Sequence, residues 1–68
     1  MNEEAIINLI QLSISMGIVE KTKIVKHIAS TNLVGKRKVA AVINNFDYQY
    51  KYWIQKKGAK NTRIFELL

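Results

Sequence analysis

The chain opens with apolar and polar residues that alternate at the three- and four-residue spacing of an amphipathic helix. Asn2 can cap such a helix, and the carboxylates of Glu3 and Glu4 in its first turn suit the helix dipole. The spacing predicts a helix over about 3–16 with an inner stripe of Ala5, Ile6, Leu9, Ile10, Ser13 and Ile14. Ile7 and Leu12 fall off this stripe, so the helix is apolar over a wide arc that favours contact with a partner.

Between residues 18 and 35 the pattern predicts a short extended segment, Ile18–Val19, followed by a second helix. Thr22 can cap this helix, which is expected to run to about residue 30. Its inner face is expected to hold Ile24, Val25, Ile28 and Ala29, with Lys23 and Lys26 outside. Leu33 and Val34 are then expected to return to the core.

A third stretch, over about 36–46, predicts a helix with one apolar and one polar face. Its buried stripe is expected to hold Val39, Val42, Ile43 and Phe46. The opposite face presents Arg37, Ala41 and Asn44; arginine and asparagine can form bidentate hydrogen bonds with base edges, and alanine permits close approach. The three bases at 36–38 lie in the first turn, against the helix dipole, which favours a phosphate backbone opposite them.

From residue 51 onward the period changes to that of β-strands. Residues 51–56 and 62–67 are rich in β-formers and predict a hairpin whose loop bends at Gly58. Three large side chains of the hairpin are expected to pack back on the helices: Trp53, Phe65 and Leu67. Its tip carries a basic arm made of Lys56, Lys57, Lys60, Asn61 and Arg63.

Composition limits the chemistry that the chain can carry. With 68 residues, 49% of them hydrophobic, it is one small folded domain over 1–68, too short for a deep catalytic cavity. There is no Cys, and His27 is the one His, so a disulfide, zinc or iron–sulfur site is excluded. The serines lack His or Asp companions at a useful spacing. We therefore expect no enzymatic activity, no cofactor, no metal and no small-molecule ligand.

The charge is distributed unevenly along the chain. Residues 1–35 are neutral, whereas residues 36–63 carry a net +7, and the whole chain carries +6. Such a basic half predicts an anionic partner for one part of the fold. The first ten residues lack the basic start of a signal peptide, and no stretch is apolar enough to span a membrane. We expect an intracellular protein, cytoplasmic or nuclear.

The order of these elements resembles the winged helix-turn-helix superfamily of DNA-binding domains, an α+β fold of three helices followed by a two-stranded wing. The likeness covers about 3–68 and consists of element order and apolar spacing. The segments that carry it are Lys23–Ala29 and Gly35–Val39 with Val42–Phe46 as the helix pair, and Tyr52–Ile54 and Arg63–Leu67 as the wing strands.

The resemblance implies that the helix over 36–46 enters the major groove of duplex DNA, while the wing reaches the backbone or minor groove. Arg37, Ala41 and Asn44 would then face base edges. Phosphate contacts would come from Lys36, Lys38 and Asn45 on the helix and from Lys56, Lys57, Lys60 and Arg63 on the wing. Such a chain would act as a small transcriptional regulator or as the DNA-binding domain of a longer protein.

Two alternatives remain open. Winged-helix domains also serve as protein–protein interaction modules in larger assemblies, and the wide apolar arc of the helix over 3–16 favours such a contact, including a homodimer. Five aromatic residues crowd into eight positions, which would also suit a stacking platform for single-stranded nucleic acid: Phe46, Tyr48, Tyr50, Tyr52 and Trp53. We favour core packing for these aromatics, because a domain this small needs its large side chains for burial.

Overall fold

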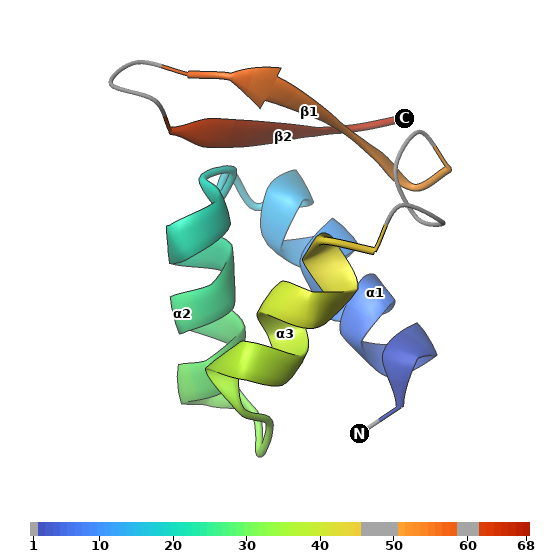
Figure 1. Cartoon of the computed structure of the whole chain (residues 1–68), viewed down its shortest axis with the longest axis vertical. Helices are drawn as coiled ribbons and strands as arrows, with labels where there is room; N and C mark the ends of the chain where they lie inside the picture. The colour runs from blue at the N-terminus through green and yellow to red at the C-terminus, as the bar shows by residue number, and fades with distance from the viewer. Residues whose placement is uncertain (1, 46–50, 59–61) are drawn as a thin grey trace.

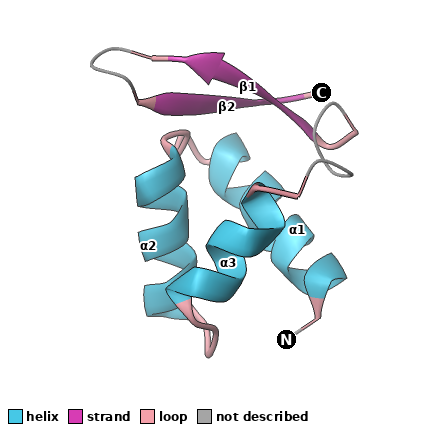
Figure 2. Cartoon of the chain, viewed as in Figure 1, coloured by secondary structure: helices cyan, strands magenta, loops and turns pink. Residues whose placement is uncertain are grey.

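The computed structural model describes residues 2–45, 51–58 and 62–68, and shows three helices followed by a two-stranded antiparallel hairpin (Figures 1 and 2). The elements are α1 (Glu3–Ser15), α2 (Lys21–Thr31), α3 (Lys36–Ile43), β1 (Trp53–Lys57) and β2 (Arg63–Leu67). The hairpin lies across one end of the helices. The predicted α+β class is confirmed, and the arrangement is consistent with a winged-helix layout.

The limits of α1 follow from local hydrogen bonds at its two ends. Asn2 caps the helix as predicted, since its Oδ1 accepts a hydrogen bond from the Ala5 N–H at 2.8 Å. After Met16, Gly17 adopts a φ of +91°, in the left-handed region that favours glycine. The Ile18 N–H then donates to the Ser13 carbonyl at 2.9 Å and closes the helix end.

The prediction that Thr22 caps α2 is wrong. Glu20 is the N-cap, with extended backbone, and its carbonyl accepts the first helical hydrogen bond from Ile24 at 2.9 Å. Thr22 therefore lies inside the first turn. The Glu20 side chain makes no capping hydrogen bond and pairs instead with Lys23, whose Nζ lies 2.9 Å from Oε2.

The loop between α2 and α3 corrects a second prediction, because Leu33 does not return to the core. Leu33 is fully exposed at 102%, while Val34 packs against the core. The Val34 N–H donates to the Asn32 carbonyl at 2.9 Å, which holds the loop in a tight turn. Neighbouring side chains in such non-helical backbone point to different sides, and here Val34 takes the inward position.

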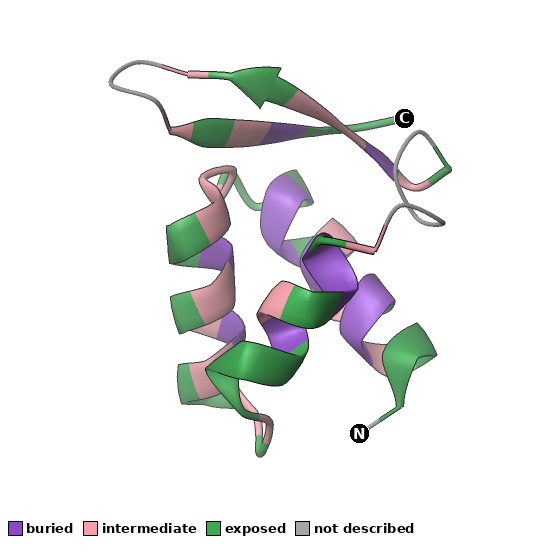
Figure 3. Ribbon diagram, in the orientation of Figure 1, coloured by how far each residue is buried: buried purple, intermediate pink, exposed green. Residues whose placement is uncertain are grey.

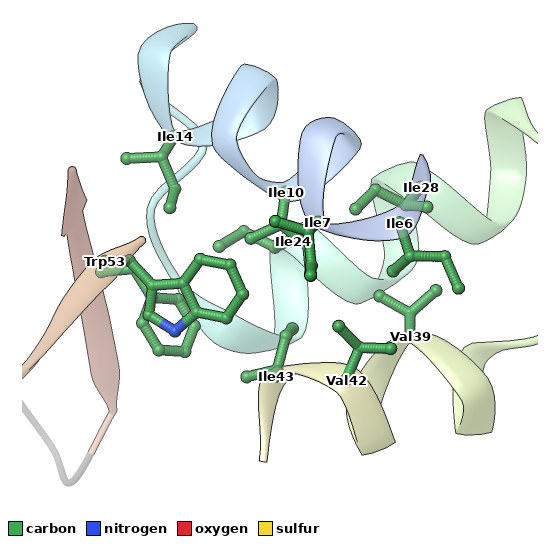
Figure 4. Packing of buried hydrophobic residues seen from close by; sticks show 11 residues of the cluster. Ile6, Ile7, Ile10, Ile14, Ile24, Ile28, Val39, Val42, Ile43 and Trp53 are labelled. Atoms are coloured by element: carbon green, nitrogen blue, oxygen red, sulfur yellow. The ribbon is translucent and has the colours of Figure 1, made fainter. Parts of the chain in front are cut away.

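Apolar side chains from all three helices meet in one core below the hairpin (Figures 3 and 4). It comprises Ile6, Ile7, Ile10, Ile14, Ile24, Ile28, Val39, Val42, Ile43, Trp53 and Phe65. Ile7 was expected off the buried stripe, yet it is only 6% exposed, because α1 is packed against α2, α3 and β2 and so buries a wide arc. Phe46 and Tyr48, together with the rest of 46–50, lie outside the described residues, and α3 ends at Ile43.

The hairpin register determines which side chains face the helices. Trp53 lies opposite Leu67, and Gln55 lies opposite Phe65, so these four residues share one face. Trp53 and Phe65 are buried and meet edge to face, with ring centroids 6.4 Å apart. The prediction that Leu67 packs in the core is wrong: Leu67 is 38% exposed near the C-terminal end of β2, although its partner Trp53 is buried.

The predicted extended segment after α1 joins the hairpin to the helices. The Phe65 N–H donates to the Val19 carbonyl at 2.8 Å, and Glu20 forms an isolated bridge with Ile64. Because Glu20 also begins α2, this contact fixes the position of β2 relative to the first turn of that helix.

Candidate nucleic-acid interface

The face of α3 that points away from the core is exposed, as the periodicity predicted. Val39, Val42 and Ile43 are buried, and this leaves Arg37, Ala41 and Asn44 on the opposite side, all exposed. Figure 3 shows exposed and buried residues interleaved along α3. Lys36 and Lys38 are also exposed in the first turn, whereas Asn45 is half-buried just beyond the helix.

Asn44 is held by a residue of the neighbouring helix. Lys21, in the first turn of α2, donates a hydrogen bond from Nζ to the Asn44 Oδ1 at 2.7 Å. A bidentate contact of Asn44 with adenine requires both its amide oxygen and its amide nitrogen. The amide oxygen already accepts the hydrogen bond from Lys21. To contact adenine, Asn44 would have to accept a second hydrogen bond at this oxygen or lose the one from Lys21.

A groove lined by lysines runs between α2 and α3. It has a volume of about 360 Å³ and is lined by Lys21, Thr22, Val25, Lys26 and Lys36. The three lysines come from two helices and line the groove together with Val25. Three positive charges around one groove favour an anionic ligand such as a phosphodiester backbone.

Two further hollows continue from this groove toward the hairpin. One, of about 400 Å³, is lined by Glu20, Lys21, Thr22, Thr62 and Arg63, and it shares Lys21 and Thr22 with the groove. The next, of about 350 Å³, is lined by Gln55, Lys56, Lys57, Thr62 and Arg63, and it shares Thr62 and Arg63. The shared residues make the three hollows adjoin. We call five of the cations along this line the basic track: Lys36, Lys26, Lys21, Arg63 and Lys57. Lys56 also lines the third hollow, and its ammonium group forms an ion pair with Glu66.

Glu20 brings a carboxylate to the middle of the basic track, and its charge is offset locally. Glu20 forms an ion pair with Lys23, so the ammonium group of Lys23 compensates the carboxylate. The hydrogen bond and the Coulombic attraction of Glu20 in turn raise the pKa of Lys23 above its ordinary value. Both side chains are accessible to water, so the pair contributes little to stability. The cations of the track thus keep their net positive field.

The predicted hairpin residues divide between two faces of the sheet. Lys57 lies directly opposite Arg63, on the face that Gln55 and Phe65 share. The Arg63 guanidinium donates to the Gln55 Oε1 at 3.4 Å. Lys56 lies on the other face and forms an ion pair with Glu66 across the strands. Lys60 and Asn61 lie outside the described residues.

Sequence reasoning missed Lys21 and Thr22 and treated Lys26 as an ordinary solvent-facing side chain. The available signal was their spacing: Lys21 and Val25 are four residues apart, as are Thr22 and Lys26, so each pair shares a face of α2. That these faces border α3 and the hairpin depends on tertiary packing, which periodicity does not report.

Other kinds of site receive no support from the part of the chain that the structure describes. Within residues 2–45, 51–58 and 62–68, no three His, Cys, Asp or Glu side chains group as a metal site would require. None of the helices formed by these residues is long and apolar enough to cross a membrane.

Comparison with known proteins gives no further assignment. The chain matches no protein-family model, and no curated protein or solved structure is significantly similar to it. The candidate interface therefore rests on its own geometry and charge.

Proposed function

We propose that the chain binds duplex DNA, with the exposed face of α3 at the base edges of the major groove and the basic track along a phosphate backbone. The observation that carries this proposal is the continuity of the track. Cations from α2, α3 and the hairpin border hollows that share residues, and the line passes beside the α3 face that presents Arg37 and Ala41.

The basic track is chemically complementary to the phosphates of a duplex, and the exposed face of α3 is complementary to its base edges. Lysine and arginine side chains neutralise phosphates and release counterions, which supplies affinity for any sequence. Arg37 can form a bidentate contact with guanine, and the small side chain of Ala41 lets the helix approach the groove closely. The major groove is wide enough to admit one helix, and α3 is the helix whose outer face carries these residues.

In biological terms the proposal is a small transcriptional regulator of the winged-helix kind, or the DNA-binding part of a longer protein. Since one such module covers only a short stretch of DNA, tight specific binding would use two modules on two half-sites.

The test is an NMR titration of the isotope-labelled chain with a random-sequence duplex of about 16 base pairs, several times the footprint of one recognition helix. We expect chemical-shift changes at 21–26, 36–45 and 57–63. A parallel titration with polyglutamate separates DNA from a generic acidic partner. Equal affinity for both polymers, or no shifts with the duplex, would refute DNA binding.

A further inference from the structure

The surface of α1 carries a second apolar stripe beside the one that faces the core. Ala5, Leu9, Leu12 and Met16 follow one another at spacings of four, three and four residues. Leu12 and Met16 are 55% and 60% exposed, while Ala5 and Leu9 are half-buried. At ~100° per residue the four positions fall within about 60° of arc. This is the spacing of the seam in a coiled coil, where two helices pack along their length.

Polar side chains border this stripe on one side of α1. This polar border carries Asn8, Gln11 and Ser15, which are uncharged, together with Glu4 near the start of the helix. On its other side the stripe adjoins the buried face of Ile6, Ile10 and Ile14, against which Leu9 packs, while Leu12 and Met16 remain exposed. An exposed apolar strip with a polar border is typical of a contact surface between proteins.

The distribution of charge indicates that the occupant is a second copy of this chain. All eleven Lys and Arg residues lie after residue 20, so α1 is free of positive charge although the chain carries +6. Two copies repel each other least when they approach through α1. In the view of Figure 1, α1 lies behind α3, so a contact there leaves the outward face of α3 uncovered.

The two ends of α1 are electrostatically complementary. Glu4 lies exposed in the first turn. A hollow of about 400 Å³ begins where the helix ends, since Gly17 directly follows Met16; it is lined by Gly17, Ile18, Lys23, Lys26 and His27. Lys23 is already paired with Glu20, which leaves Lys26 as the cation to receive a carboxylate. An antiparallel partner would bring its Glu4 to this end of the helix.

We propose that two copies of the chain form a twofold-symmetric dimer through antiparallel α1 helices. Met16 of one copy packs against Ala5 of the other, and Leu12 packs against Leu9, so that each large exposed side chain meets a smaller or recessed one. Each end is closed by an ion pair between Glu4 and Lys26 of the other copy. This inference goes beyond DNA binding and does not depend on it. Lys26 lines both the groove of the basic track and the hollow at the end of α1, so the dimer is tested without DNA.

Sedimentation equilibrium of the whole chain without DNA tests the contact. We expect a monomer–dimer equilibrium in the wild type. Leu12→Glu should weaken it by about 100-fold or more, since a carboxylate would be buried against apolar side chains. Leu33→Glu is the matched control, because it adds the same charge at a fully exposed leucine outside α1. A wild type that stays monomeric at about 1 mM, or a dimer that tolerates Leu12→Glu, overturns the proposal.

A charge exchange tests the antiparallel register. Glu4→Lys and Lys26→Glu should each weaken the dimer about fivefold, since each change places like charges together at both ends. The double variant should recover the wild-type dissociation constant. A dimer in which the two effects simply add has a different register, and this part of the proposal is then wrong. Circular dichroism of Leu12→Glu, and of Met16→Glu at a second exposed position, distinguishes loss of the dimer from loss of the fold.

Discussion

Lys21 and Asn44 connect the start of α2 to the end of α3 through a hydrogen bond of 2.7 Å between Nζ and Oδ1. The bond lies at the surface, between two residues that are 23 positions apart. It places the Lys21 ammonium group beside the candidate base-reading face and, at the same time, on the lining of two of the three hollows. Lys21 is thus the residue at which the α3 face and the basic track meet.

Replacing Lys21 should therefore affect DNA binding more than folding. Lys21→Ala removes one exposed hydrogen bond and is expected to change the free energy of unfolding by about 1 kcal/mol or less. It should weaken binding to all duplex sequences alike and lower the slope of log K against log salt by about one unit. Fluorescence anisotropy over a series of salt concentrations measures both quantities.

The matched control for Lys21 is Lys51→Ala. Lys51 is an exposed lysine whose ammonium group lies 5.4 Å from the centre of the Tyr52 ring, and it lines none of the three hollows. Lys51→Ala removes one positive charge, as Lys21→Ala does, but should leave the salt slope unchanged. If the two variants behave alike, only net charge matters and the track has no local role.

Arg37 should contribute sequence preference as well as affinity. Its side chain is exposed on the outer face of α3, so Arg37→Ala should leave the free energy of unfolding within about 0.5 kcal/mol of wild type. If Arg37 reads a guanine, the variant should lose about 1–3 kcal/mol of binding free energy on the preferred site and lose preference at one base pair. Selection from a random duplex library, followed by affinity measurements on matched and mismatched sites, tests this. An equal loss on every sequence would make Arg37 a phosphate contact.

The contrast between α3 and the basic track shows how far the sequence alone could predict this structure. The periods of 3.6 and 2 residues are local signals, and they predicted all three helices, both strands and the burial of Val39, Val42 and Ile43. The same signals identified Arg37 and Ala41 as exposed. Lys21 and Thr22 could not be found in this way, because their position depends on how α2 meets α3 and the hairpin.

The predictions that failed did so where a neighbouring contact outweighs a local preference. Threonine is a good N-cap, yet the bridge between Glu20 and Ile64 holds Glu20 in the extended conformation that an N-cap requires, and α2 begins there. Leu33 and Val34 are equally apolar, and only the tight turn at Asn32 decides which of them is buried. Neither contact is encoded in the spacing of apolar residues.

The helix caps give a stability test of this correction. Asn2→Ala should lower the free energy of unfolding by about 0.5–2 kcal/mol, because the Asn2 side chain satisfies the Ala5 N–H. Thr22→Ala should have an effect of about 0.5 kcal/mol or less, since Thr22 is exposed and is not the cap. Urea denaturation followed by circular dichroism measures both. A large loss for Thr22→Ala would restore Thr22 as the cap of α2.

The two faces of the hairpin make different predictions for two adjacent lysines. Lys57 shares the face of Arg63 and lies on the basic track, whereas Lys56 points to the other side and pairs with Glu66. Lys57→Ala should therefore weaken DNA binding on every sequence and lower the salt slope by about one unit. Lys56 also lines the third hollow, but its ammonium group pairs with Glu66, so Lys56→Ala should lower the slope by less than Lys57→Ala does, with a change in unfolding free energy of about 1 kcal/mol or less. A reversed result would place the DNA on the Glu66 side of the hairpin. Because the two variants have the same net charge, only the face that meets the phosphates can distinguish them.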